Sequence, residues 1–297
     1  MRESMRLGVR AFVPQRVAGI GLAALVLAGC GTGVGAESSV DASAGDEVAR
    51  AVEKTEDVTF LSYRVTGRFP ERGRIADEAT VRTTQPVAAR LRTANLSGDQ
   101  QGESELRLVD GVLYGSATGD MVEEMGGRHW ISYGPHAKFT THGGLRMDVG
   151  GLRDQVSRNP AREAAFLAAA EDVKRIASAK VDGADTTHYA GTAAVGELRA
   201  SLDEVKDKTA REERRNSLDQ YEKLGVDELT LDVWVDGDDR IKRLRTQGFG
   251  RHGTLDLTFT FLDHGKAVTV RAPRADDTAD LRKPLKKKTT PRTCASP

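Results

Sequence analysis

Residues 59–69 have the sequence TFLSYRVTGRF, in which apolar and polar side chains alternate. Leu61, Tyr63 and Val65 fall on one side of this repeat, whereas Ser62 and Arg64 fall on the other. Successive side chains of a β-strand point to opposite faces of its sheet, so a period of two indicates a strand with one dry face and one wet face. The stretch therefore predicts a sheet that packs against other elements on one side only.

The same alternation recurs on both sides of the middle of the chain. It predicts earlier strands at residues 75–83, 87–93, 106–109, 112–116 and 129–133. It predicts later strands at residues 173–181, 186–194, 229–235 and 254–261, and Val268 and Val270 continue the pattern. Asp-Gly pairs at residues 110–111, 182–183 and 236–237 are strong signals for tight turns. Short strands joined by tight turns favour an antiparallel sheet.

Helical spacing is found before the first strand and in the middle of the chain. Asp46 is expected to cap a first helix whose buried face carries Val48, Ala51, Val52 and Thr55. Asn159-Pro160 is typical of a helix start, and a short helix is expected before it, around Leu152 and Val156. A further helix is expected to carry Leu198, Leu202 and Val205 on one face. The charged segment 206–216 is expected to separate it from the apolar residues Leu218, Tyr221 and Leu224, and Gly225 is expected to be the C-cap after them. We therefore expect an α+β fold with one curved antiparallel sheet, covered on one face by helices, in a single domain at 46–272.

The first 29 residues have the features of an export signal. Four arginines precede an apolar stretch at residues 17–27, which is too short to span a bilayer. The stretch ends in Leu27-Ala28-Gly29-Cys30, which resembles the bacterial lipobox, and this resemblance implies cleavage before Cys30 and acylation of its thiol. An ordinary secretory signal with a chance cysteine is the alternative. Residues 30–45 are rich in glycine and serine and are expected to form a flexible tether.

The charge of the chain is distributed unevenly. Removal of residues 1–29, with four arginines and one glutamate, would change the formal charge from 0 to −3. Residues 273–297 are expected to form a disordered tail, which is basic from Arg282 onward and would touch an anionic surface or remain a solvated terminus. Because the rest of the chain is acidic, we expect no nucleic-acid binding. With Cys30 acylated, Cys294 has no partner in the chain for a disulfide, and it would be an exposed thiol or a dimer contact.

Motifs for catalysis, metals or cofactors are not apparent. Residues 248–253 match G-x-G-x-x-G, but a strand follows them instead of a helix, so we interpret them as a turn or bulge. The acidic residues 236–239 fail the spacing of a calcium loop and are expected to form a solvated hairpin turn. The six histidines lack the helical zinc spacing, although His136 and His142 share a glycine-rich loop. We therefore predict no catalytic residue, no metal and no cofactor.

Several segments resemble actinobacterial lipoproteins of the LppX/LprG type, whose fold is similar to that of the lipoprotein carrier LolA. The resemblance is carried by the lipobox, by Asp182-Gly183 followed by residues 186–192, and by residues 233–237 before Arg240-Ile241. Residues 110–114, followed later by Trp130-Ile131, fit the same plan. The resemblance implies a half-barrel sheet around helices, enclosing an apolar cavity for acyl chains.

The function implied by the resemblance is binding or transport of a lipid, a glycolipid or another apolar ligand at the outer face of a membrane. Any cavity would be lined by the dry strand face, namely Leu61, Tyr63, Val65, Leu229, Leu231, Val233, Leu255, Leu257 and Phe259. The alternative for this face is an ordinary filled core. The alternative functions are an envelope interaction or sensor protein without a cavity, whose polar sheet face recognises another protein, and a hydrolase with an unrecognised site.

Overall fold

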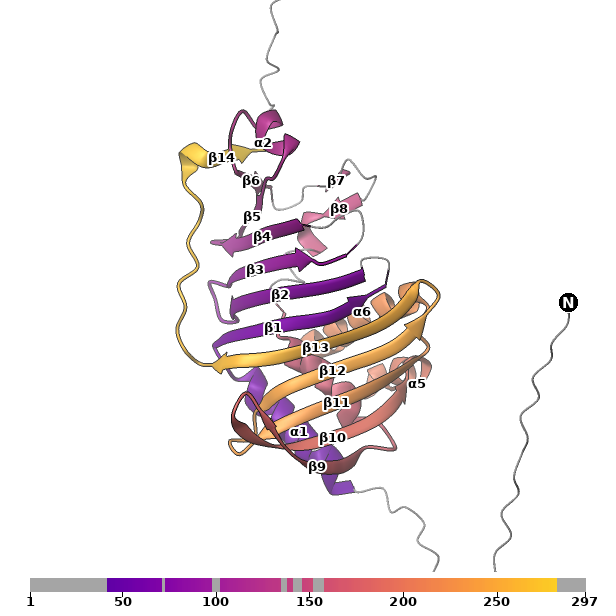
Figure 1. The fold of residues 1–297 in the computed structure, drawn as a ribbon. Coiled ribbons are helices and arrows are strands. Elements are labelled where there is room, and N and C mark those ends of the chain that lie inside the picture. The colour runs from indigo at the N-terminus through magenta and orange to yellow at the C-terminus, as the bar shows by residue number, and fades with distance from the viewer. Residues whose placement is uncertain are drawn as a thin grey trace, which may run out of the picture. The chain divides into compact units, whose positions relative to one another are not determined.

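The computed structural model describes residues 42–70, 73–97, 102–134, 138–140, 146–151 and 158–281, with the backbone alone for 42–43, 138–140 and 146–148. Twelve strands in these ranges form one sheet in the order β14-β6-β5-β4-β3-β2-β1-β13-β12-β11-β10-β9. Neighbours are antiparallel except β14 and β6, which are parallel. The edge strands β14 and β9 are not paired with each other, so the sheet is open (Figure 1).

The sheet strands in the first half of the chain are β1 (Phe60–Phe69), β2 (Gly73–Arg82), β3 (Ala88–Asn95), β4 (Gly102–Val109), β5 (Val112–Ser116) and β6 (Trp130–Tyr133). Those in the second half are β9 (Lys174–Val181), β10 (Ala184–Ala194), β11 (Glu228–Asp236), β12 (Ile241–Gly250), β13 (Gly253–His264) and β14 (Thr278–Asp280). A separate antiparallel pair consists of β7 (Lys138–Thr140) and β8 (Arg146–Asp148). The α-helices are α1 (Ala42–Glu56), α2 (Asp120–Glu124), α4 (Ala165–Ala168), α5 (Val195–Ala200) and α6 (Lys208–Leu224), and the 3-10 turns are η1 (Pro160–Ala164), η2 (Ser201–Glu204) and η3 (Ala275–Asp277).

The alternation in residues 59–69 is confirmed as strand β1. Its apolar residues Leu61, Tyr63 and Val65 are buried, whereas Arg64 and Thr66, on the other side of the alternation, are exposed. We call the face of the sheet that bears Leu61, Tyr63 and Val65 the inner face, and the opposite one the outer face. Strand β1 pairs with β2 on one side and with β13 on the other, so the sheet joins the two halves of the chain at its centre.

Two of the predicted Asp-Gly turns have the geometry that this residue pair favours. Asp110 and Gly111 have φ angles of 49° and 75°, and Asp182 and Gly183 have φ angles of 47° and 84°. Two successive positive φ angles match the right-handed twist of the flanking strands, and Asp and Gly tolerate them better than other residues do. The third turn, after Asp236, is longer: the Asp236 carboxylate accepts hydrogen bonds from the N–H groups of Asp238 and Arg240.

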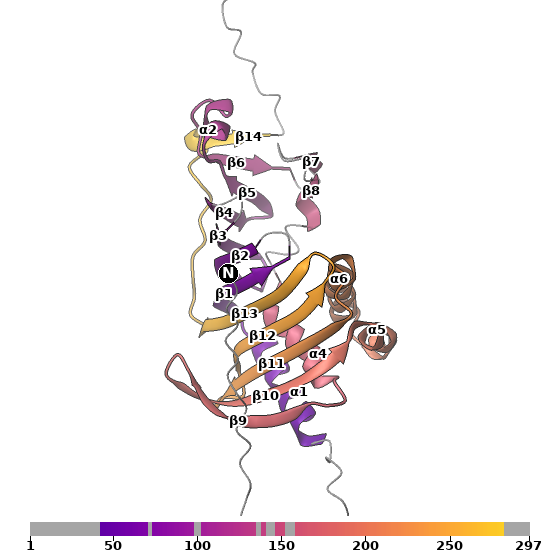
Figure 2. The same cartoon turned by 45° about the vertical axis from the view of Figure 1, so that its right-hand side comes forward.

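The helices cover the inner face of the second half of the sheet. Helix α1 contacts β9, β11 and β12, helix α4 contacts β10 and β11, and α5 contacts β10. Figures 1 and 2 show α1 and α5 on one side of these strands. Thr55 holds this layer in place, because its hydroxyl accepts a hydrogen bond from Ile241 N at 3.1 Å and its carbonyl accepts one from Asn159 Nδ2 at 3.0 Å. The predicted α+β fold, an open antiparallel sheet with helices on one face, is confirmed.

The first helix begins earlier than predicted. It begins at Ala42, so residues 42–45 are helical instead of part of a tether, and Asp46 lies within the helix instead of capping it. The cause is close packing of small residues, since Ala44 is fully buried and a Cβ at Gly45 would lie 3.2 Å from the carbonyl oxygen of Ala168. Such contact with α4 stabilises the extra turn.

The charged segment 206–216 does not interrupt the helical region, contrary to the prediction. Helix α6 runs without a break from Lys208 to Leu224, with Asp207 as its N-cap and Gly225 as its left-handed C-cap. Among its charged side chains, Glu213 forms an ion pair with Arg162, and Arg211 donates hydrogen bonds to the carbonyl of Val205. On the buried side, Tyr221 donates a hydrogen bond to Glu163 at 2.8 Å and Ser217 donates to the same carboxylate. Burial raises the pKa of Glu163, although these two hydrogen bonds oppose the rise.

The end of the sheet differs from the prediction at three strands. Strand β12 was not predicted, and Val268 and Val270 do not form a strand. Strand β13 already pairs with β1 and β12, so no edge remains beside it for the segment that follows. The chain instead continues to β14, which pairs with the open side of β6 and buries Ala279. Residues 278–280 therefore belong to the sheet, and the folded region extends beyond the predicted boundary at 272.

Candidate ligand-binding face

Seven of the nine predicted ligand-binding residues are buried on the inner face. On β1, Leu61, Tyr63 and Val65 are 1%, 7% and 5% exposed. On β11, Leu229, Leu231 and Val233 have no exposed surface, and Leu255 on β13 has 1%. Leu257 and Phe259, also on β13, are only half-buried.

The helix-covered half of this face is a filled core. Leu229, Leu231 and Val233 belong to one apolar cluster with Val48 and Val52 of α1 and with Phe166 and Leu167 of α4. Complete burial of the three β11 side chains means that helix side chains occupy the space above them. A role for these three residues in ligand binding remains a prediction.

The other half of the inner face lies away from these helices, and its side chains form a row across the strands. The strand register aligns residues from five neighbouring strands, β13, β1, β2, β3 and β4, in one row: Phe261, Tyr63, Ala79, Leu91 and Leu106. Phe261 is fully buried, Tyr63 and Ala79 are 7% and 5% exposed, and Leu91 and Leu106 are only half-buried. Burial thus decreases along this row, whereas Leu108 and Leu113, on the same face of β4 and β5, are 4% and 0% exposed.

Three other half-buried side chains extend this surface. Tyr133 on β6 packs over Gly115, where an added Cβ would lie 3.0 Å from its ring and 3.5 Å from Leu106. Phe259 lies beside Tyr63, with ring centroids 6.3 Å apart, and Leu257 follows on the same strand. We call the five half-buried side chains the apolar strip: Leu91, Leu106, Tyr133, Leu257 and Phe259.

A few polar groups accompany the strip. Burial raises the pKa of Tyr63, and the negative charge of Asp77 adds to the rise, so the phenol stays protonated and can donate a hydrogen bond. Asn95, which pairs with Ile75 on the same face, has a buried Oδ1 that accepts no hydrogen bond from the described residues. These groups could bind a polar atom of a ligand whose apolar part lies on the strip.

Two hollows on the surface of the described residues lie elsewhere. One, of about 510 Å3, opens at the end of α1 and is lined by residues that include Lys54, Asp57, Arg240 and His264. The other, of about 280 Å3, is lined by residues that include Thr66, Arg68, Arg74 and Asp256. Neither lies between the helices and the sheet, so an apolar cavity remains a proposal.

Sequence reasoning identified the inner face but missed Leu91, Leu106 and Tyr133 as candidate site residues. A signal for the first two was present, because Leu91 alternates with Arg90 and Arg92, and Leu106 alternates with Glu105 and Arg107. Their strands were predicted, but alternation does not indicate where the helical layer ends.

Several predicted features lie outside the described residues. These are the lipid-anchor cysteine Cys30, the thiol of Cys294, the histidines His136 and His142, and the helix around Leu152 and Val156. Within the described ranges, no group of three or more His, Cys, Asp or Glu side chains could hold a metal ion. No helix of those ranges is long and apolar enough to cross a membrane.

No family model matches the chain, but individual proteins do. A Streptomyces griseus protein named "Uncharacterized 31.2 kDa protein in rplA-rplJ intergenic region" is 30% identical over 186 residues, which are 62% of this chain and 59% of that protein. The Streptomyces coelicolor protein named "Putative lipoprotein SCO4650" is 26% identical over 182 residues, which are 61% of this chain and 52% of that protein. The matches thus span less than two thirds of the length of either relative.

Among solved structures, the lipoprotein LppX of Mycobacterium tuberculosis aligns with 78% of this chain over 100% of its own length. It is 16% identical and has a TM-score of 0.46. The chain resembles proteins named as lipoproteins. The resemblance to actinobacterial lipoproteins that the motifs predicted thus agrees with the name of the Streptomyces coelicolor relative.

Proposed function

We propose that this chain is a membrane-anchored extracytoplasmic lipoprotein that binds or shuttles a lipid or another apolar ligand, without catalysis. The observation that carries the proposal is the apolar strip, five side chains on the inner face that the helices leave half-buried. Apolar surface of this kind is stabilised when an apolar partner removes it from water, at about 25 cal/mol per Å2. The lipobox at Cys30 and the likeness to named lipoproteins support the location.

The proposal assigns seven of the nine predicted residues to three groups. Leu257 and Phe259 would contact the ligand together with Leu91, Leu106 and Tyr133. Leu229, Leu231 and Val233 would instead support the strip from the packed core, because helix side chains already cover them. Tyr63 and Val65 lie between the two regions and would form the floor of the site.

The test measures binding of a fluorescent long-chain fatty acid to the full chain in a mild non-ionic detergent. Leu106→Gln places an amide in the strip and is expected to weaken binding about tenfold, since a buried amide without a partner costs about 1–3 kcal/mol. Leu262→Gln is the matched control, because Leu262 is already 41% exposed on β13. Equal affinity of both variants and the parent chain would contradict ligand binding at the strip and favour an envelope interaction protein without a cavity.

A further inference from the structure

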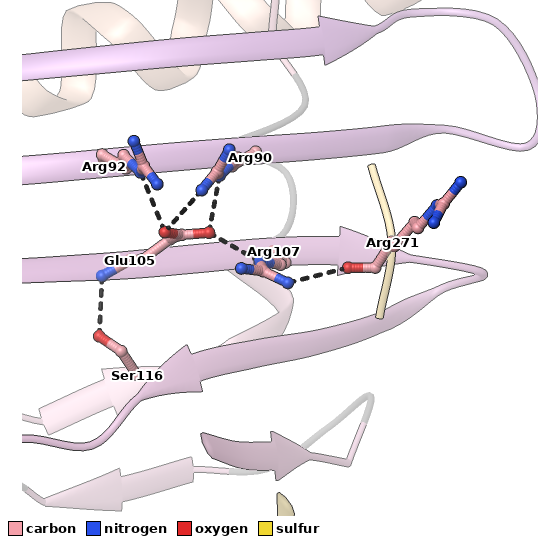
Figure 3. Close-up of polar contacts among 6 residues, drawn as sticks. All are labelled: Arg90, Arg92, Glu105, Arg107, Ser116 and Arg271. Carbon is pink, nitrogen blue, oxygen red and sulfur yellow. Dashed lines mark hydrogen bonds and ion pairs between the residues drawn. The ribbon is translucent and has the colours of Figure 1, made fainter. Parts of the chain in front are cut away.

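Three arginines converge on one carboxylate on the outer face, opposite the inner-face strip (Figure 3). Arg90 donates two hydrogen bonds to the two oxygens of Glu105, at 2.7 and 3.1 Å. Arg92 donates from Nε to Glu105 Oε2 at 3.0 Å, and Arg107 donates from Nε to Glu105 Oε1 at 2.7 Å. We call Arg90, Arg92 and Arg107, with Glu105 between them, the arginine cluster.

The cluster has a surplus of two positive charges. Three guanidinium groups are permanently charged, and Glu105 supplies one negative charge. Two further acidic side chains flank Arg92 on this face. Glu78, opposite Arg92 on β2, forms a 3.8 Å ion pair with Arg64, and Glu103, two residues before Glu105 on β4, is exposed to solvent. Arg90 and Arg107 are direct cross-strand partners, an arrangement that repels unless an anion lies near both.

Backbone and ring contacts fix part of the cluster in place. The guanidinium carbon of Arg107 lies 4.3 Å from the centre of the Trp130 ring, and its Nη1 donates to the carbonyl of Arg271 at 3.2 Å. The N–H of Glu105 donates to Ser116 Oγ at 2.8 Å. Arg107 and Glu105 are largely buried, with side chains 22% and 14% exposed. Their positions are thus set before any ligand arrives.

Donors remain available at the solvent side of the cluster. The side chain of Arg92 is 57% exposed, and its Nη1 and Nη2 groups form no hydrogen bond with the described residues. The side chain of Arg90 is 36% exposed. Guanidinium groups with free, parallel N–H donors match the oxygens of a phosphate group, which can accept two such bonds at once.

We propose that the arginine cluster is a binding site for a phosphate group, either free inorganic phosphate or the phosphodiester of an anionic lipid headgroup. The phosphate accepts hydrogen bonds from Arg92 and Arg90 and neutralises the charge that Glu105 leaves uncompensated. The site lies on the opposite face from the apolar strip and does not depend on the proposed ligand there. If the phosphate belongs to a phospholipid, the cluster also turns the outer face of the first half of the sheet toward a membrane surface.

The experiment uses the full chain in a non-ionic detergent and follows its thermal unfolding midpoint at constant ionic strength. One arm titrates inorganic phosphate against chloride, and a second adds short-chain phosphatidylglycerol to the micelles, with short-chain phosphatidylcholine as its reference. Arg92→Gln is expected to weaken the apparent affinity at least about fivefold, since it removes charge-assisted hydrogen bonds at a partly exposed site. Arg92→Lys, which keeps the charge but not the paired donors, is expected to recover only part of this loss.

Arg245→Gln is the matched control. Arg245 lies on β12, also on the outer face, and its two hydrogen bonds to Asp256, both at 2.8 Å, pair one cation with one anion. The variant loses the same charge, and its affinity is expected to stay unchanged. A response to both phosphate sources supports a site for the free ion, and a response to phosphatidylglycerol alone supports a lipid headgroup. No saturable response to either source, or an equal loss in Arg245→Gln, overturns the proposal.

Discussion

Complete burial of Val233 makes it a direct probe of the filled half of the inner face. Val233→Gln is expected to lower the free energy of unfolding by about 3 kcal/mol, because it buries an amide without a partner beneath α1 and α4. Thr230→Gln is the control on the same strand, where the side chain is exposed and the change is expected to stay within about 0.5 kcal/mol. Urea unfolding of both variants measures the difference. A stable Val233→Gln protein would show that the space above Val233 is open.

Glu105 is expected to make folding sensitive to acid. Its partial burial alone would raise the pKa of its carboxyl, but hydrogen bonds from Arg90, Arg107 and Arg92 outweigh this effect and lower the pKa from 4.5 to about 2. A lowered pKa in the folded state stabilises the protein above the unfolded value, and this contribution is lost as the pH falls from 4.5 towards 2. Glu105→Gln should therefore flatten the dependence of unfolding free energy on pH in this window. An unchanged slope would show that the arginines do not bind the carboxylate in solution.

Individual residues also show how far alternation can predict a site. It assigned Leu61, Tyr63 and Val65 to a common face correctly, because the period of a strand fixes which side chains share a face. It gave no sign that Leu91 and Leu106 are half-buried while Leu231 is fully covered. Leu108, two residues after Leu106 on the same strand and face, is 4% exposed, so the difference is decided by tertiary packing at each position and not by the strand pattern.

Among the elements, helix α6 was predicted wrongly, because its charged first half was expected to interrupt the helical region. Asp207 accepts a hydrogen bond from Ala210 N at 2.7 Å and caps the helix. Asp207→Ala is expected to cost about 1 kcal/mol of stability, because it removes the cap and leaves an N–H unpaired. Lys206→Ala, one residue outside the cap, is the control. Thermal unfolding compares the two, and equal midpoints would indicate that the helix starts elsewhere.

The strands show the same division between local and tertiary information. Most of them were predicted from period two and from Asp-Gly turns, because both signals are local. Strands β7, β8, β12 and β14 were missed, and Val268 and Val270 were wrongly assigned to a strand. Whether a segment pairs depends on a free sheet edge beside it, and β6 offers one to Ala279 whereas β13 offers none to Val268.

For the molecule as a whole, the proposed anchor decides where it acts. Cys30→Ser is expected to release the chain from the membrane fraction, because the thiol is the proposed site of acylation and the apolar stretch before it is too short to span a bilayer. Cys294→Ser is the matched control and is expected to remain with membranes. Fractionation with labelled palmitate measures both. Retention and labelling of the Cys30→Ser chain would contradict the anchor.

The central claim is that an apolar molecule lies on the strip of the inner face. The most direct measurement is mass spectrometry of a solvent extract of the full chain, purified in mild detergent beside an identically purified Leu106→Gln chain. Extraction removes bound ligand and leaves any covalently attached acyl chain on the protein. The account predicts a lipid in near-stoichiometric amount from the parent chain and several-fold less from the variant. Extracts that contain no lipid, or the same amount from both chains, would contradict it.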